Sequence, residues 1–226
     1  MLSRATAIRQ LQFTLKSQIS ATSRRGFIST AAMSSISDVI IKDHRELETY
    51  YNEVLNTSDH DHQERYGNQF VWELARHSVG EELVVYPAFE KYLGPTGKMR
   101  ADKDREEHHR VKELLKEFQQ MKPKDSEYTP KLKEIWTLLS PHIEDEESGD
   151  LPALENALKE HAGQSDTMAK SFSRTKMFVP TRSHPSAGEN PMFESAAGLL
   201  AAPMDRLADM FRKFPDDPDS ANGGSR

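Results

Sequence analysis

The sequence predicts an all-α protein, an up-down-up-down four-helix bundle followed by a mostly irregular C-terminal tail. Four segments carry apolar residues at the helical period of three to four. The connections between these segments are short, so consecutive helices should run antiparallel. In addition, side chains able to bind metal recur on the apolar stripes at a fixed interval, which indicates that the stripes face one shared interior.

The first two helices are expected at about residues 37–56 and 63–93. Ser37 is a suitable N-cap for the first, and Pro87 should kink the second or end it early. Their stripes at the helical period contain Ile36, Ile40, His44, Leu47, Tyr51 and Val54 in the first, and Phe70, Leu74, His77, Glu81, Val84 and Ala88 in the second. The polar run 57–62 is the expected loop between them.

The third and fourth helices are expected at about residues 99–121 and from Pro130, which is a good first-turn residue. Turns are predicted at 94–97 and 122–126, where glycine and proline interrupt the pattern. Pro141 should distort the turn before His142. The third stripe holds His108, Val111, Leu115 and Phe118, and the fourth holds Leu132, Ile135, Leu139, His142 and Glu146. A short additional helix, Leu151–His161, should pack on the end of the bundle and complete a domain at 36–160.

The composition describes a polar chain without cysteine. Of its 226 residues, 36% are hydrophobic and 29% are charged, and no stretch reaches the roughly 18–20 apolar residues of a membrane span. The absence of cysteine excludes disulfides, iron–sulfur clusters, thiolate zinc sites and cysteine nucleophiles, which leaves nitrogen and oxygen as metal ligands.

Residues 1–34 have the composition of a mitochondrial transit peptide. The segment is rich in serine, contains no acidic residue and has spaced apolar residues, which is typical of such peptides. Its basic residues are Arg4, Arg9, Lys16, Arg24 and Arg25. We therefore expect import to the mitochondrion, with the matrix as the destination. The alternative is a basic N-terminal arm on a cytoplasmic protein.

The rest of the chain is acidic. Without the five basic residues of the N-terminal segment, 25 basic residues face 36 acidic ones, a net charge of −11. Such a body is a poor binder of nucleic acid. At the other end, residues 165–226 contain proline, serine and glycine and read as an extended tail. Within this tail, Leu199–Phe214 is predicted to form a short amphipathic helix.

Four histidines and two glutamates form an internal repeat. The interval from His44 to His108 equals, to within one position, the interval from the pair His77–Glu81 to the pair His142–Glu146. Each pair has the four-residue spacing that places both side chains on one helical face. All six residues lie on otherwise apolar stripes, with no lysine or arginine on those stripes near them. Because buried unpaired carboxylates cost several kcal/mol, a pair of divalent cations is the expected neutralising partner.

Each signal alone is weak. A lone histidine on an apolar stripe is more often a satisfied core residue, and a single His-x-x-x-Glu occurs often by chance. Glu146 lies in the run 144–147, which alone would suggest a solvated acidic face. Taken together, the two identical pairs and the common repeat favour a metal site. Imidazole and carboxylate ligands suit two iron ions, and manganese or zinc would also fit.

This pattern resembles the hemerythrin-like (HHE cation-binding) domain over about residues 36–160. The resemblance rests on His44, His77 with Glu81, His108, and His142 with Glu146, and the surrounding Gly80-Glu81-Glu82 and Leu151-Pro152 are also similar to the family. It implies a four-helix bundle with a non-haem di-iron centre held by these six residues. It also implies that oxygen, peroxide or nitric oxide can reach the iron.

The chain departs from the oxygen-carrying hemerythrins at two positions. Those carriers have a second histidine four residues beyond the first on the third helix, where this chain has Lys112. They also have an aspartate on the fourth helix, whereas Glu146 follows His142 at four residues. The resemblance therefore implies more open coordination and argues against reversible oxygen carriage.

Several neighbouring residues are alternative ligands. His109 is an alternative to His108, Glu82 and Glu147 are alternatives to Glu81 and Glu146, and Asp104 is a possible extra ligand four residues before His108. The remaining histidines, His60, His62, His161 and His184, are expected at the surface.

The function expected from these residues is iron binding and, through iron, binding of oxygen or of reactive oxygen or nitrogen species. This describes sensing, storage or detoxification, so a binding protein is expected rather than an enzyme. The alternatives are a di-iron enzyme that consumes peroxide or nitric oxide, and an interaction module that metal only stabilises. The sequence names no protein partner.

Overall fold

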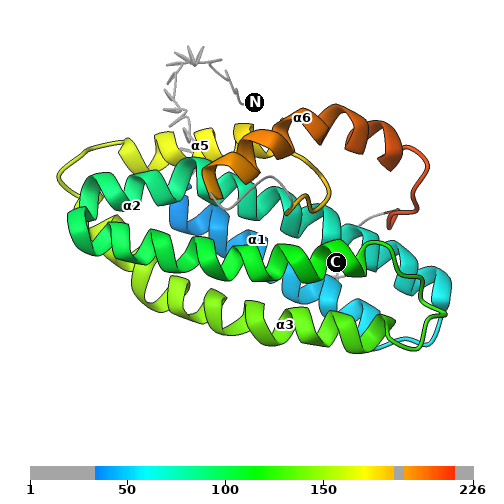
Figure 1. The fold of residues 1–226 in the computed structure, drawn as a ribbon. Coiled ribbons are helices and arrows are strands. Elements are labelled where there is room, and N and C mark those ends of the chain that lie inside the picture. The colour runs from blue at the N-terminus through cyan, green and yellow to red at the C-terminus, as the bar shows by residue number, and fades with distance from the viewer. Residues whose placement is uncertain (1–33, 186–190, 217–226) are drawn as a thin grey trace, which may run out of the picture. The chain divides into compact units, whose positions relative to one another are not determined.

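The computed structural model describes residues 34–185 and 191–216, and this part of the chain contains helices and no strand. The all-α prediction is thus confirmed (Figure 1). The helices are α1 (Ile36–Leu55), α2 (His60–Phe118), α3 (Tyr128–Asp145), the π-helix η1 (Glu146–Asp150), α4 (Leu151–Leu158), α5 (Gln164–Lys176) and α6 (Pro191–Asp209). The expected transit peptide, 1–34, lies almost entirely outside the described residues. No described helix is long and apolar enough to cross a membrane.

The first helix begins with a capping box. The Ser35 hydroxyl accepts a hydrogen bond from the Asp38 amide at 3.0 Å, and the Asp38 carboxylate accepts one from the Ser35 amide at 2.8 Å. This reciprocal pair satisfies two amides that have no partner within the helix. The cap is therefore Ser35 rather than the expected Ser37, and the helix ends one residue before the predicted boundary.

The two predicted middle helices form one long element, α2, that reverses at Gly94. Gly94 has φ 61° and ψ −136°, a left-handed backbone that favours glycine. At Gly97 an added Cβ would lie 1.9 Å from the carbonyl oxygen of Phe89, so only glycine permits this close return. Pro87 neither ends α2 nor gives it non-helical dihedral angles, which occur within α2 only at Gly94. The reversal lies at the predicted turn, and residues 60–93 and 95–118 run alongside one another (Figure 1).

The helix after the second turn changes its winding at a predicted ligand. α3 carries Pro141 internally and continues to Asp145, where the chain passes into the π-helix η1 that begins with Glu146. A π-turn holds an extra residue and occurs often at functional sites. The winding returns to α at Leu151, which starts the short α4 expected from the sequence.

Two apolar clusters fill the bundle, one on each side of a polar layer. Leu47, with Phe70, Leu115 and Leu132, belongs to the first cluster. Ile40, with Ile36, Phe89 and Leu154, belongs to the second. His44 lies between Ile40 and Leu47 on the same face of α1, so the helical period that builds the two cores also places an imidazole between them.

The tail is more helical than the sequence predicts. α5 occupies part of the segment expected to be extended, and its Phe172 is almost fully buried against α2. The contact is close because residue 80 is glycine: an added Cβ there would meet the Phe172 ring at 2.8 Å. α6 begins at Pro191, before the expected start at Leu199, and ends at Asp209. Composition misled the prediction, since α5 is stabilised by packing on the bundle rather than by its own apolar content.

Candidate metal centre

The structure brings all six predicted ligands into the polar layer of the bundle. They come from α1, from both arms of α2, from α3 and from η1, and each is buried, with no more than 3% of its surface exposed: His44, His77, Glu81, His108, His142 and Glu146.

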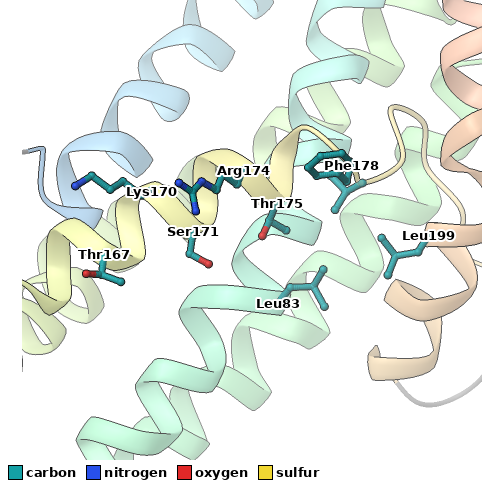
Figure 2. Close-up of a pocket in the computed structure, with 9 residues that line it drawn as sticks. Leu83, Thr167, Lys170, Ser171, Arg174, Thr175, Phe178 and Leu199 are labelled. Carbon is teal, nitrogen blue, oxygen red and sulfur yellow. The ribbon is translucent and has the colours of Figure 1, made fainter.

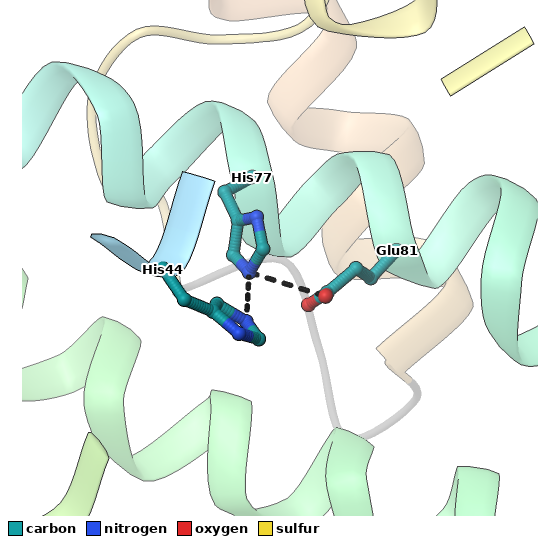
Figure 3. Close-up of side chains that lie close together, drawn as sticks. All are labelled: His44, His77 and Glu81. Carbon is teal, nitrogen blue, oxygen red and sulfur yellow. Dashed lines mark hydrogen bonds and ion pairs between the residues drawn. The ribbon is translucent and has the colours of Figure 1, made fainter. Parts of the chain in front are cut away.

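One pair of imidazoles comes from α1 and the first arm of α2. The Nε2 atoms of His44 and His77 lie 3.2 Å apart. Glu81 places Oε1 3.1 Å from Nε2 of His77. Figure 3 shows the His77 ring between His44 and Glu81, with a dashed line to each. On the other side, Glu146 places Oε2 3.4 Å from Nε2 of His44. His44, His77 and Glu81 therefore form one group of ligand atoms, and Glu146 approaches it beside His44.

The second pair repeats this arrangement with the other half of the bundle. The Nε2 atoms of His108 and His142 also lie 3.2 Å apart. The remaining oxygen of Glu81, Oε2, lies 3.4 Å from Nε2 of His108. Glu81 thus lies between the two histidine pairs, with one oxygen toward each, and can bridge two cations rather than serve one alone.

The distances among these atoms suit a cation at the centre of each group. Ligand atoms about 2.1 Å from a shared ion lie about 3.0–3.4 Å apart at octahedral or tetrahedral angles. The separations found here, 3.1–3.4 Å, fall in this range. Within the described residues, the three-residue groups with ligand atoms close enough to share an ion include His44–His77–Glu81 and Glu81–His108–His142.

The two central carboxylates need a positive partner. None of the four oxygens of Glu81 and Glu146 makes a hydrogen bond of good geometry with the described residues. Both glutamates are completely buried. Leaving such groups unsatisfied costs several kcal/mol each, and a pair of bound cations removes that cost. The donor set therefore fits a dinuclear metal centre.

The outward nitrogen of each histidine has its own carboxylate. Nδ1 of His44 lies 2.9 Å from Glu147, Nδ1 of His77 lies 3.2 Å from Asp43, Nδ1 of His108 lies 3.3 Å from Glu82 and Nδ1 of His142 lies 3.0 Å from Glu107. An N–H donated from Nδ1 leaves the lone pair of Nε2 directed inward, which is how metal-binding imidazoles are commonly fixed. In this geometry Glu82 and Glu147 contact the outward nitrogens, whereas Glu81 and Glu146 lie beside the inward ones.

Sequence reasoning missed Asp43 and Glu107. A signal was present, because each directly precedes a predicted ligand and the two are separated by the same interval as His44 and His108. Glu82 and Glu147, each directly after a predicted ligand, are separated by the same interval as Glu81 and Glu146. The orienting carboxylates therefore follow the same internal repeat as the ligands.

Each orienting carboxylate contacts a cation in turn. Two of these cations are buried lysines: Lys112 pairs with Glu82, and Lys176 of α5 pairs with Asp43. The other two are exposed: Arg45 pairs with Glu147, and Nζ of Lys103 lies 3.4 Å from Glu107. We call each series of imidazole, carboxylate and cation a charge chain. Lysines do approach the site, contrary to the sequence expectation, but their salt bridges are with this outer layer rather than with Glu81 or Glu146.

The electric field of the site shifts the pKa values of its groups strongly. Burial alone would lower the pKa of His77, but the charge of Glu81 and the hydrogen bond to Asp43 outweigh burial and raise it to about 10. The pKa of His142 is likewise raised to about 9 by Glu107 and Glu146 against the effect of burial. Burial would raise the pKa of Glu146, but His44 and His142 lower it to about 2. These shifts favour protonated His77 and His142 and an ionised Glu146.

The two histidine pairs have unequal surroundings. The Tyr86 hydroxyl lies 3.0 Å from Nε2 of His108. Asp104 is buried with Oδ2 unsatisfied, and its pKa is raised to about 7 by burial and by the nearby Glu146 and Glu81. In the other half of the repeat, Leu151 corresponds to Tyr86, and Ile40 corresponds to Asp104. The His108–His142 side is therefore polar where the His44–His77 side is apolar.

The remaining histidines lie away from the centre. His109 is half-buried and contacts Glu113, whereas His108 is buried, so His108 is the histidine of this pair that enters the core. His60 and His161 are exposed and His62 and His184 are half-buried, as expected of surface residues. A surface hollow of about 500 Å³ lies beside α5, lined by Leu83, Phe178 and Leu199 among others, and contains none of the predicted ligands (Figure 2).

Comparison with known proteins agrees with this geometry. Residues 35–154 match the family described as the hemerythrin HHE cation binding domain. An uncharacterized hemerythrin-like protein of Schizosaccharomyces pombe is 56% identical over 183 residues, which cover 81% of this chain and 89% of that protein. A DNA nickase of Nostoc is 24% identical over 148 residues, 66% of this chain and 41% of the nickase. No solved structure matches the chain.

Proposed function

The chain belongs to the hemerythrin HHE cation-binding family, and from this premise we propose that it is a non-haem di-iron protein. The proposed ligands are His44, His77, Glu81, His108, His142 and Glu146. Through iron the protein would bind oxygen, peroxide or nitric oxide, in sensing, storage or detoxification. We further propose that it acts in the mitochondrial matrix, on the basis of the N-terminal composition.

The observation that carries this proposal is the isolation of Glu81 and Glu146. Their carboxylates are fully buried, Glu81 beside Nε2 of His77 and His108 and Glu146 beside Nε2 of His44, and they make no hydrogen bond of good geometry among the described residues. Two cations would satisfy both glutamates and all four nitrogens together. Nitrogen and carboxylate oxygen suit iron, with manganese or zinc as chemically compatible substitutes.

Bound iron would supply redox chemistry and an open coordination position for a small molecule. The protein's own residues have three tasks around it. The orienting carboxylates direct the Nε2 lone pairs inward. The apolar clusters on both sides exclude bulk water from the layer. Tyr86 and Asp104 offer polar groups on the His108–His142 side, where a small oxygen-containing molecule could be held by hydrogen bonds.

Metal analysis tests the proposal directly. Metal-free protein reconstituted anaerobically with ferrous iron should retain two iron ions per chain after desalting. Exposure to air should then produce the near-ultraviolet absorption of an oxidised di-iron centre. The matched control is Glu113→Leu, an exposed glutamate whose carboxylate lies 3.5 Å from His109, and this variant should bind the same amount. Retention of no iron, manganese or zinc by the wild-type protein would refute the proposal.

A di-iron enzyme remains the second candidate because the site has a polar side. If Tyr86 and Asp104 assist the consumption of peroxide or nitric oxide, the iron-loaded protein should turn over many equivalents of that compound. A binding protein should stop at about one equivalent per site. The third candidate, an interaction module, is favoured only by the exposed apolar residues of α6, such as Leu200 and Met204. It requires partner binding that survives metal removal.

A further inference from the structure

Lys176 is an unusual residue for its position. It is the last residue of α5, beyond the residues 35–154 that match the family, yet it reaches the polar layer of the bundle. Only 7% of its surface is exposed, whereas lysine is almost never buried without a partner. A buried ammonium group next to a proposed metal position therefore needs a specific explanation.

Packing fixes the lysine at both ends. The absence of a side chain at Gly80 lets Phe172 and the stem of Lys176 lie against α2. Nε of Arg76 donates a hydrogen bond to the carbonyl oxygen of Lys176 at 2.9 Å. The backbone of Lys176 is thus held by α2, and the side chain extends toward Asp43 of α1 and Glu73 of α2.

The ammonium group lies between two buried carboxylates. Nζ of Lys176 pairs with Asp43 of α1 and with Glu73 of α2. Asp43 accepts from Nδ1 of His77 at 3.2 Å with the same oxygen, Oδ2, that contacts the lysine. Glu73 is four residues before His77 and also contacts Arg76 at 3.3 Å. Asp43 therefore connects the Lys176 ammonium to Nδ1 of His77 through a single carboxylate oxygen.

Removing the charge of Lys176 should displace Asp43. Ligand oxygens of Asp43 and Glu73 lie within 4.8 Å of one another, and two carboxylates at this distance in a buried setting repel strongly. The repulsion would turn Asp43 away from Nδ1, and the His77 ring would lose the partner that directs Nε2 inward. Loss of such an outer partner typically lowers metal affinity about 10–100-fold.

We infer that Lys176 is a positioning residue of the metal centre, which acts through Asp43 to set the affinity of the His44–His77 position. This inference rests on the proposed function, because it assumes that the six ligands bind metal. If the inference is correct, α5, which follows the residues 35–154 that match the family, contributes to the metal centre. Lys112 supplies an internal comparison, since it has the equivalent place in the charge chain of His108.

The test is a titration of metal-free protein with ferrous iron under anaerobic conditions, in competition with a chelator. Wild type should show two binding events. Lys176→Met should weaken one event about tenfold or more and leave the other unchanged. Lys176→Arg should restore most of the loss because it keeps the charge. The matched control is Lys170→Met on the same helix, whose exposed ammonium contacts Asp166, and it should behave as wild type.

A double-mutant cycle separates positioning from mere packing. If Lys176 acts through Asp43, then Lys176→Met should have little further effect in an Asp43→Asn background. Lys112→Met should remain additive with Asp43→Asn, since it belongs to the other histidine pair. Additive effects of Lys176→Met and Asp43→Asn would overturn the inference.

Two further outcomes are informative. If Lys176→Met does not fold, as judged by circular dichroism, then Asp43→Asn and Glu73→Gln replace it. The first should weaken one binding event and the second should not, and equal effects would overturn the inference. Two unchanged events in folded Lys176→Met would also overturn it and leave the proposed function intact. Absence of binding by wild type would instead refute the proposed function.

Discussion

Glu81 places one carboxylate oxygen 3.4 Å from Nε2 of His108, although the Gly94 reversal separates the two residues along α2. One glutamate thus contacts an imidazole on each arm of the same helix. Among the described residues this carboxylate has no hydrogen bond of good geometry, and it lies in the same buried layer as Glu146. Metal binding and fold stability should therefore be coupled through these two glutamates.

Replacing both glutamates should separate stability from metal binding. The double change Glu81→Leu and Glu146→Leu should abolish iron binding, because it removes both central carboxylates, and the stability of the variant should no longer depend on metal. Chelation of the wild type should lower its melting temperature, whereas the double mutant should not respond to chelator. Thermal unfolding with and without chelator measures both. Equal melting temperatures for metal-free and metal-loaded wild type would contradict the coupling.

Metal uptake should release protons near neutral pH. His77 and His142 have pKa values raised to about 10 and about 9, so both are protonated in the metal-free protein at pH 7.5 and must lose the proton to bind metal. About two protons per chain should therefore be released. Calorimetry in two buffers of different ionisation enthalpy counts them, and a buffer-independent heat would be the contrary result. Acid release of metal should begin at a higher pH than an unperturbed imidazole would allow.

The same shifts predict the pH dependence of the metal-free fold. The raised pKa values of His77 and His142 contribute stability below about pH 6.5, which is lost as pH rises through 9 and 10. The lowered pKa of Glu146, about 2, contributes stability above about pH 4.5, which is lost as pH falls toward 2. Denaturant titrations should place the maximum between these limits, and metal should shift it upward. A metal-free protein most stable at pH 9 would contradict these assignments.

Gly80→Ala should destabilise the protein by about 1–3 kcal/mol through overpacking. The added Cβ would lie 2.8 Å from the Phe172 ring, which is buried and has little room to move. Gly149→Ala is the matched control, because its Cβ would make an ordinary contact at 3.6 Å with Arg100. Urea unfolding of both variants measures the difference. If α5 does not pack on α2, the two variants should unfold alike.

Oxygen should oxidise the ferrous protein rather than bind reversibly. Lys112 occupies the place of the carriers' additional histidine, and the structure gives its ammonium to Glu82 rather than to the centre. Absorption spectra taken in air and then under vacuum should show oxidation within minutes that vacuum does not reverse. Lys112→His should weaken iron binding, because it removes the ammonium group that pairs with Glu82, the carboxylate that contacts Nδ1 of His108. Full recovery of the reduced spectrum under vacuum would contradict this prediction and favour reversible oxygen carriage.

Residues 1–34 should direct a fused reporter to mitochondria. Their basic, serine-rich and acid-free composition is the basis for this expectation. The recovered protein should begin near Ser35, the N-cap of α1, so processing would leave the first helix intact. Fractionation and N-terminal sequencing measure both. A reporter that stays in the cytosol would favour the alternative of a basic arm.

The sequence predicts the bundle well because its signals are local. Three such signals are visible along the chain: the helical spacing of apolar residues, the glycines at 94 and 97, and the repeat that contains His44 and His108. The orienting carboxylates follow that repeat and were within reach of the same reasoning. Their cations do not follow it: Lys176 comes from α5, which is stabilised mainly by tertiary packing. Contacts that depend on a non-repeating segment carry no periodic signal, so only the structure shows them.

The π-helical segment Glu146–Asp150 allows α3 and α4 to keep different helical registers, so that Glu146 and the apolar residues of α4 each face their own partners. A π-turn holds one more residue than an α-turn, so deleting the exposed Ser148 would restore regular winding and rotate everything after it by about 100°. Leu151 and Leu154 would then leave the apolar cluster that contains Ile40. The additional residue therefore uncouples the direction of Glu146 from the packing of α4. Substitutions in α4 can therefore accumulate without changing the direction of Glu146. An insertion or deletion within residues 146–150 would change it relative to α4.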